Sequence, residues 1–254
     1  MGPRRIHLSV LTGLVLALLL AAGTPVAAQI PDEFTNLKVL PKEIGKREMV
    51  SIMRQFSSAL GVRCKHCHVG EDPESLEGYD FASDALEPKR VARAMMEMSA
   101  LINREGMPMT GRKDAIRVTC LTCHRGLVRP VTIEAVMLDV IDAEGVSTAE
   151  TRYRELRDQY YGKGAFNFGP EPLNSIAETL SQEKDDLAGA ISIMKLNVEF
   201  NPDNVGNYLI LGKLYAVSKD TVAAAAAFER ALELEPDNPW AKQMLEQLKS
   251  VDQP

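Results

Sequence analysis

The sequence is poor in the residues that usually bind metals or hold an exported domain together. Only four cysteines, four histidines and one tryptophan occur among 254 residues. Positive charge is not in excess either, because the formal net charge of −6 argues against a general nucleic-acid binder. Beyond residues 8–22, no stretch is apolar enough to cross a bilayer. The interpretation therefore depends on where the few cysteines and histidines lie.

The N-terminal segment has the pattern of a secretory signal. Arg4 and Arg5 precede an apolar run over residues 8–22, which gives way to the small residues Val-Ala-Ala ending at Ala28. A basic start, an apolar centre and a small-residue end predict a cleaved signal peptide over residues 1–28 and a periplasmic mature protein. An uncleaved membrane anchor is the alternative, but the run is shorter than the ~20 residues that a span needs.

The four cysteines form two closely spaced pairs, and a histidine follows each pair directly. Four cysteines in an exported protein would usually indicate two disulfides. A disulfide within either pair, however, would close too short a loop to stabilise the fold much. The C-x-x-C-H pattern instead predicts covalent attachment of haem. The two motifs are Cys64-Lys65-His66-Cys67-His68 and Cys120-Leu121-Thr122-Cys123-His124.

In such attachment, two thiols add to the two vinyl groups of haem, and the adjacent histidine then lies beneath the iron. The sequence therefore predicts two molecules of haem c, with His68 and His124 as proximal iron ligands. One zinc ion held by four cysteines is a competing interpretation, but it leaves both histidines unexplained. A thioredoxin-like redox pair is disfavoured because no βαβ pattern surrounds either motif. The covalent anchors are Cys64, Cys67, Cys120 and Cys123.

The second ligand of each iron can be narrowed by elimination. His7 lies in the predicted signal and His66 lies inside its own motif, so methionine is the remaining choice and would raise the reduction potential. We predict Met53 and Met98 as the distal ligands, although core packing is the ordinary role of such methionines. Met49 and Met95, one helical turn back, are the alternatives. Two predicted helices carry these residues on apolar faces: about 42–60, with Met49, Ile52, Met53, Phe56 and Leu60, and about 88–103, with Val91, Met95, Met98 and Ile102.

Basic residues gather around the second motif, with Asp114 as the one acid among them. Haem propionates need charged partners where water is partly excluded. We expect Arg125 and Arg129 to contact a propionate and the others to form a solvated basic face. The basic residues are Arg112, Lys113, Arg117, Arg125 and Arg129.

The C-terminal third repeats itself. Residues 201–204 read Asn-Pro-Asp-Asn, and residues 235–238, displaced by 34 positions, read Glu-Pro-Asp-Asn. A 34-residue period that includes Gly212 and an alanine-rich stretch resembles the tetratricopeptide repeat, a pair of helices joined by a turn. We predict one complete repeat over about 204–235, the second helix of an earlier repeat before it, and a closing helix after it. An ordinary alanine-rich helical hairpin is the alternative.

These patterns predict an all-α protein with three parts after the signal. Residues 29–130 form a multihaem c-type cytochrome domain, and residues 131–185 form a connector with one or two helices. Residues 186–250 form a small tetratricopeptide-like helical-repeat domain. So short an array is expected to pack against the rest of the protein, since isolated repeats bury too little surface to be stable.

The region around the motifs resembles a known family, the cytochrome c subunit of photosynthetic reaction centres. The resemblance implies that Met53 and Met98 are the axial ligands. The family subunit carries four haems, so this chain resembles half of one, and the lipid-bearing N-terminal cysteine common in the family is absent. The repeat region is not part of that subunit. The residues that carry the resemblance are Met53-x-x-Phe56-Ser57-x-x-Leu60-Gly61-Val62-x-Cys64, Met98-x-x-x-x-Asn103 and Val118-Thr119-Cys120-x-Thr122-Cys123-His124-Arg125-Gly126.

The function expected from the sequence is transfer of single electrons between redox partner proteins. The resemblance implies a membrane reaction centre, or another membrane electron-transfer complex, as one partner. The repeat domain is expected to bind a further protein, and no nucleic-acid partner is expected. We expect no enzymatic activity. The alternatives are a dihaem peroxidase, which needs one releasable iron ligand, and a repeat-domain adaptor with redox-sensing haems.

Overall fold

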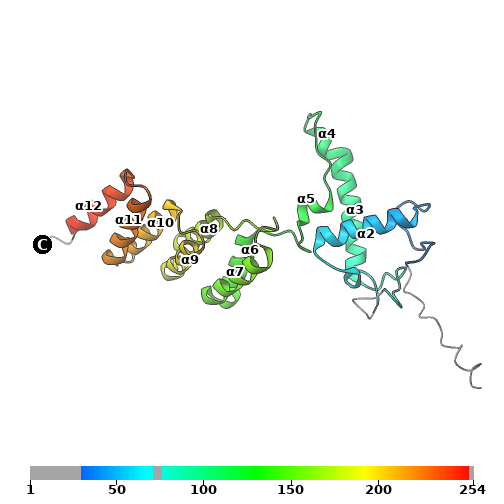
Figure 1. The fold of residues 1–254 in the computed structure, drawn as a ribbon, viewed down its shortest axis with the longest axis horizontal. Coiled ribbons are helices and arrows are strands. Elements are labelled where there is room, and N and C mark those ends of the chain that lie inside the picture. Colours follow the sequence, from blue (N-terminus) through cyan, green and yellow to red (C-terminus); the bar gives the residue numbers. More distant parts are fainter. Residues whose placement is uncertain (1–29, 71–75, 252–254) are drawn as a thin grey trace, which may run out of the picture. The chain divides into compact units, whose positions relative to one another are not determined.

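The computed structural model describes residues 30–70 and 76–251, which form helices, loops and one isolated β-bridge between Val69 and Asp80 (Figure 1). The predicted all-α fold is confirmed. The described residues divide into two compact units. The first contains the chain up to Ser57 and Val62–Thr119, and the second contains Ser58–Gly61 and the chain from Cys120 onward. The predicted signal peptide lies outside the described residues.

Two longer helices dominate the first unit. Helix α2 spans Lys46–Leu60 and helix α3 spans Glu87–Leu101, so both helices predicted here are confirmed. Helix α3 begins where Pro88 occupies its first turn, a position at which proline costs no hydrogen bond. The shorter elements of this unit are a 3-10 turn over Cys64–His66, a π-helical turn over Ile102–Gly106 and helix α4 over Met107–Met109.

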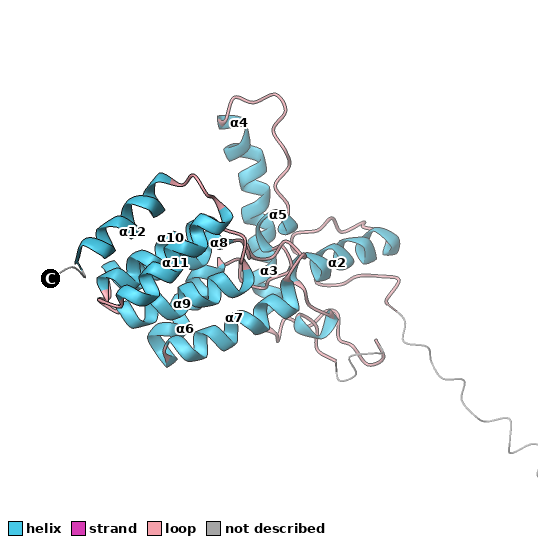
Figure 2. Cartoon of the chain, turned by 60° about the vertical axis from the view of Figure 1, so that its left-hand side comes forward, coloured by secondary structure: helices cyan, strands magenta, loops and turns pink. Residues whose placement is uncertain are grey.

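The second unit is a series of helical hairpins that follows the short helix α5, Cys120–His124 (Figures 1 and 2). Helix α6 packs on α7, α8 on α9, and α10 on α11, while α12 packs on α11. Neighbouring hairpins are joined by contacts of α8 with α6 and of α9 with α7 and α10. The bounds are α6 Ile133–Glu144, α7 Val146–Tyr160, α8 Pro170–Gln182, α9 Leu187–Phe200, α10 Val205–Val217, α11 Thr221–Leu234 and α12 Pro239–Val251.

The 34-residue repeat of the sequence is visible in how helices begin. The Asn204 side chain accepts a hydrogen bond from the backbone N–H of Asn207 at 3.1 Å, and Asn238 accepts one from Ala241 at 3.0 Å. Each asparagine thereby satisfies an N–H group that the first helical turn leaves unpaired. A methyl group on Gly212 would lie 2.6 Å from the Phe228 ring, so only glycine permits this approach of α10 to α11. The predicted tetratricopeptide-like organisation is confirmed.

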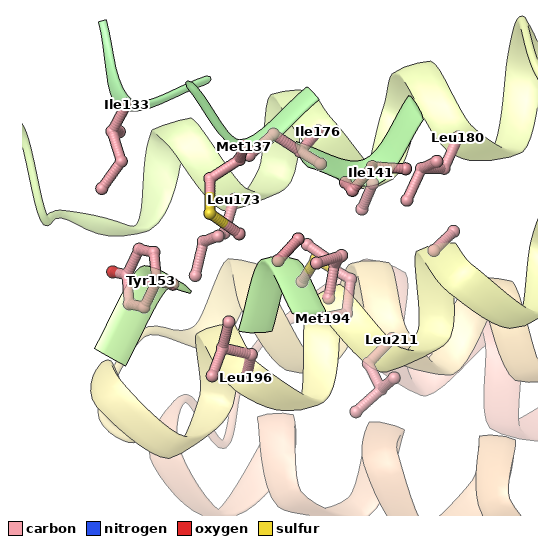
Figure 3. Close-up of a cluster of buried hydrophobic side chains, with 14 of the residues drawn as sticks. Ile133, Met137, Ile141, Tyr153, Leu173, Ile176, Leu180, Met194, Leu196 and Leu211 are labelled. Carbon is pink, nitrogen blue, oxygen red and sulfur yellow. The ribbon is translucent and has the colours of Figure 1, made fainter. Parts of the chain in front are cut away.

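The helical array is longer than the sequence predicted. The predicted connector, residues 131–185, contains three helices, α6, α7 and α8, instead of one or two. Their side chains share one apolar core with α9 and α10, which includes the fully buried Met137, Tyr153, Leu173 and Met194 (Figure 3). The array therefore starts at Ile133 and continues through residue 186 without a boundary.

Buried asparagines join successive hairpins at one end. The fully buried Asn197 amide of α9 donates to the Pro170 carbonyl and to the Asn174 side chain of α8, each at 2.8 Å. It also lies 3.2 Å from the side-chain oxygen of the buried Asn207 of α10. Buried amides with satisfied partners specify one packing arrangement, because any other would leave them unpaired.

Among the described helices, none is long and apolar enough to span a membrane.

Candidate cofactor site at the two cysteine motifs

The first motif is a compact helical turn. The carbonyl of Cys64 accepts hydrogen bonds from the backbone N–H groups of Cys67 at 3.2 Å and His68 at 3.0 Å. This turn holds the two thiols and the histidine in one short segment, as the sequence predicts. His66 and Lys65 line an open cavity together with Arg63, and neither Cys67 nor His68 lines it. The exclusion of His66 as an iron ligand stays a prediction, with which this arrangement agrees.

The His68 ring is held by a loop that folds back beside it. The Val69 carbonyl accepts a hydrogen bond from the Asp80 N–H at 2.8 Å, which brings the next residue, Phe81, alongside His68. The two rings meet edge to face with centroids 5.1 Å apart. Lys89 of α3 fixes this loop by donating to the carbonyls of Phe81 at 2.8 Å and Ser83 at 2.7 Å.

The surroundings of His68 favour its neutral form, and burial is the main cause. Burial lowers the pKa of the imidazole, and the Lys89 ammonium and the Arg93 guanidinium lower it further. A neutral imidazole is the form that can bind a metal ion. The buried Nδ1 atom of this ring has no hydrogen-bond partner among the described residues. Its environment therefore differs from that of the second histidine.

The second motif is helix α5, and the turn after it orients His124. His124 is buried, and its Nδ1 lies 2.8 Å from the Leu127 carbonyl. A carbonyl only accepts hydrogen bonds, so Nδ1 is the donor, and in the neutral ring Nε2 is then the nitrogen with a free lone pair. The Leu127 N–H in turn donates to the His124 carbonyl at 2.8 Å. Metal-binding histidines are commonly oriented in this way, by a carbonyl that accepts from the nitrogen opposite the metal.

The turn that orients His124 also meets the end of helix α2. Arg125 and Gly126 have φ angles of 48° and 92°, as in a tight turn with two left-handed residues. The Gly126 N–H donates to the Ala59 carbonyl at 2.8 Å. A methyl group on Gly61, whose φ is 67°, would lie 2.3 Å from the Gly126 carbonyl oxygen. The segment three residues before Cys64 therefore crosses the segment two residues after His124, backbone against backbone.

All four cysteines are free thiols. Burial raises the pKa of the Cys67 thiol, and the neighbouring Cys64 raises it further, whereas Lys89 opposes the increase. Burial likewise raises the pKa of Cys120. Reactive redox pairs lower the pKa of a thiol, whereas the shifts at Cys67 and Cys120 are upward. Within the described residues, no three His, Cys, Asp or Glu side chains gather as metal-binding groups do.

The predicted methionines differ in accessibility. Met49 of α2 is only 6 % exposed, whereas Met53, one turn later, is half-buried. On α3, Met98 is 45 % exposed and Met95 is half-buried. Since the sulfur atom of an iron ligand must be accessible to the metal and not packed in the core, Met53 is a better candidate than Met49. The assignment of Met53 and Met98 stays a prediction.

Helix α3 presents an apolar face that the described residues leave uncovered. It has no buried residue, although its stripe of Val91, Met95 and Met98 has the spacing of a core-facing helix. Val91 and Leu101 are, like Met98, nearly half exposed. An uncovered apolar face in the same unit as the free thiols of Cys64 and Cys67 fits a large apolar cofactor. Arg125 and Arg129 are both exposed, and their contact with propionates stays a prediction.

Sequence reasoning assigned no role to three residues that the structure places at the motifs. Phe81 contacts the His68 ring, Lys89 fixes the loop that carries Phe81, and Asn103 binds the chain ahead of the second motif. Phe81 gave no sequence signal, because a loop outside any regular element brings it to the histidine. Lys89 of α3 gave none either, because its role depends on that same loop. Asn103 was visible only as part of the family pattern.

Comparison with known proteins supports the family resemblance. Residues 73–159 match the family described as photosynthetic reaction centre cytochrome C subunit. The matched residues include Met98, Asn103 and the second motif, and they continue into α7. The first motif and the Met53 segment lie ahead of the match. About a third of the chain is covered, so the resemblance predicted from the sequence is confirmed for this segment.

Solved helical-repeat structures are similar to part of the chain. The first TPR of Spaghetti (RPAP3) bound to an HSP90 peptide shares 21 % identity over 47 % of this chain and 89 % of its own, with a TM-score of 0.32. The first TPR domain of human RPAP3 shares 21 % identity over 47 % and 88 %, with a TM-score of 0.33. The Sgt2 TPR domain from Aspergillus fumigatus shares 18 % over 47 % and 76 %, with a TM-score of 0.32. Because these TM-scores are low, the array is identified from the packing of its own helices in pairs.

Proposed function

We propose that this chain is a periplasmic dihaem c-type cytochrome that transfers single electrons between redox partner proteins. The observation that carries the proposal is the arrangement at His124. Its Nδ1 lies within hydrogen-bond distance of the Leu127 carbonyl, which would leave Nε2 available to a metal ion, and it follows two free thiols on one short helix. The first motif presents the same residues on a helical turn. The matched family supports a cytochrome more than an enzyme.

Haem iron supplies reversible one-electron oxidation and reduction, and the chain's own residues supply attachment and orientation. Cys64 and Cys67 would anchor one haem, and Cys120 and Cys123 the other. The Leu127 carbonyl would keep His124 in the tautomer that can bind a metal ion, and the ring contact with Phe81 would restrict rotation of His68. Met53 and Met98 would complete the coordination, which closes each iron to substrates and favours electron transfer over bond-making chemistry.

The direct test is the mass of the mature protein after denaturation. Two haems that stay with the denatured chain are expected, because thioether bonds survive unfolding. The paired variants Cys64→Ala/Cys67→Ala and Cys120→Ala/Cys123→Ala should each keep one haem, and the peptide that carries it identifies the motif. A wild-type protein with bound zinc, intact disulfides or a single haem would contradict the proposal. The mature N-terminus from the same spectra tests cleavage after Ala28.

The helical array is proposed to dock a redox partner or a membrane electron-transfer complex. Helical-repeat surfaces commonly bind extended protein segments, and docking would raise the local concentration of the partner. Removal of the chain from residue 186 onward is a poor test, because it would take α9 away from α8 and expose Leu173, which is buried in their shared core. Cross-linking in the native cell envelope is better. Cross-links from the exposed array lysines Lys195, Lys213 and Lys242 to another protein are expected, and their absence would count against docking.

A further inference from the structure

The two motifs are reached from their methionine-bearing helices in different ways. In the first, Cys64 follows the end of α2 by four residues, and the N–H of Val62 donates to the Ser57 carbonyl of the same helix at 3.0 Å. In the second, the exposed residues 111–117 lie between α4 and the motif and form no helix. Such a segment cannot by itself fix the position of the second motif, because a connection without regular structure allows many end-to-end distances.

Asn103 supplies the missing constraint. Its side-chain amide donates to the Val118 carbonyl at 2.7 Å, and its side-chain oxygen accepts from the Val118 N–H at 2.8 Å. The same amide donates to the Ser99 carbonyl at 2.8 Å, which ties it to the end of α3. The Ser99 hydroxyl adds a longer bond to the Val118 carbonyl at 3.3 Å. Val118 is thus bound on both backbone groups, two residues ahead of Cys120.

The local helix geometry accounts for this placement. Asn103 lies in a π-helical turn, whose extra residue changes the direction of the side chains that follow α3. Such turns are frequent at functional sites. A side-chain amide has both a donor and an acceptor, so it can pair with the N–H and the carbonyl of one residue as a neighbouring strand would. Asp lacks the donor, and Ala lacks both groups.

We propose that Asn103 is a positioning residue that fixes the chain ahead of the second motif to the helix that carries Met98. It does for the second motif what the short backbone turn at Val62 does for the first. This inference rests on the proposed function for its consequence, since correct placement of Cys120 matters for attachment and ligation of the second haem. The hydrogen bonds that carry it involve this chain alone.

The experiment compares Asn103→Ala and Asn103→Asp with a control, Arg104→Ala, in the full-length protein. Arg104 is the next residue along the chain, and its exposed side chain pairs only with the exposed Glu105 among the described residues. The first measurement is hydrogen exchange at the Val118 N–H. Loss of its acceptor in Asn103→Ala should accelerate exchange about tenfold or more. Asn103→Asp, which keeps an acceptor, should accelerate it less, and the control should match wild type.

The second measurement is the haem carried by each motif, read from peptides of the mature protein. Asn103→Ala should lower occupancy of the Cys120 peptide, or convert its haem to high spin, with the Cys64 peptide unchanged. Equal losses at both motifs would indicate general destabilisation and overturn the proposal, as would unchanged exchange at Val118 or a control with the same effect. If wild type carries no haem, the proposed function fails, while the exchange comparison still decides whether Asn103 holds Val118.

Discussion

Replacement of Gly61 by alanine tests the crossing of the two motif segments. The added methyl group would lie 2.3 Å from the Gly126 carbonyl oxygen, which is backbone and cannot rotate away. The φ of 67° also forces alanine into a left-handed conformation that costs about 1–2 kcal/mol. Displacement of Gly126 to relieve the contact would break its hydrogen bond to Ala59, at about 1–3 kcal/mol for buried groups left unpaired. We expect the free energy of unfolding to fall by about 2–5 kcal/mol in total.

The matched control is Gly162→Ala. Gly162 has a φ of 74°, belongs to the same compact unit, and has no atom within 4 Å of the position its methyl group would take. It should therefore lose only the conformational part, about 1–2 kcal/mol. Urea unfolding of the haem-loaded protein, followed by circular dichroism, measures both variants against wild type. Equal losses within about 0.5 kcal/mol, the usual range of neutral changes, would refute the close approach of Gly61 to Gly126.

Three further variants test other parts of the structure. Asn197→Ala leaves acceptors of α8 unpaired in the core of the array, so thermal unfolding should show a loss of about 2–4 kcal/mol; an unchanged melting temperature would refute the buried network. Hydrogen bonds from Lys38 and Asn36, with Arg93, hold the pKa of the Asp84 carboxyl well below its usual range, so its stabilisation is present above about pH 4 and lost as the pH falls further. Asp84→Asn should flatten this acid-side loss in a pH series of unfolding curves, and an unchanged slope would contradict it. Met98→Ala should convert one haem to high spin and lower its potential, whereas an unchanged absorption spectrum would move the ligand to Met95 or another residue.

Local patterns predicted the elements whose signals lie within a few residues. The spacing of Met49, Met53 and Leu60 predicted α2, and the 34-residue displacement of the Asn-Pro-Asp-Asn segment predicted α10, α11 and α12. The motif residues could likewise be recognised from the sequence, because all the residues of a C-x-x-C-H motif lie within five consecutive positions. Helix caps such as Asn204 follow from the same short-range logic.

Features that depend on distant residues were not predictable from one sequence. Helices α6 and α7 carry no recognisable repeat signature, and the start of α6 precedes that of α8 by 37 residues instead of 34. The sequence of residues 131–185 therefore predicts only a connector, although their helices belong to the array. The placement of Phe81 beside His68 depends on a loop that returns through Val69 and Asp80. The role of Asn103 depends on a partner fifteen residues away, at the far end of a segment with no pattern.

The hydrogen bond from Gly126 to Ala59 has a consequence for the order of folding. Residues 59 and 126 are 67 positions apart, and the loop between them contains the first motif, helix α3 and both cysteines of the second motif. Closure of a loop of this length has an entropic cost that must be met before the contact stabilises anything. As the chain leaves the ribosome or the export channel N-terminus first, the end of α2 has no partner until the turn after His124 has emerged. The contact between the end of α2 and the turn after His124 therefore forms late, after both motifs have emerged.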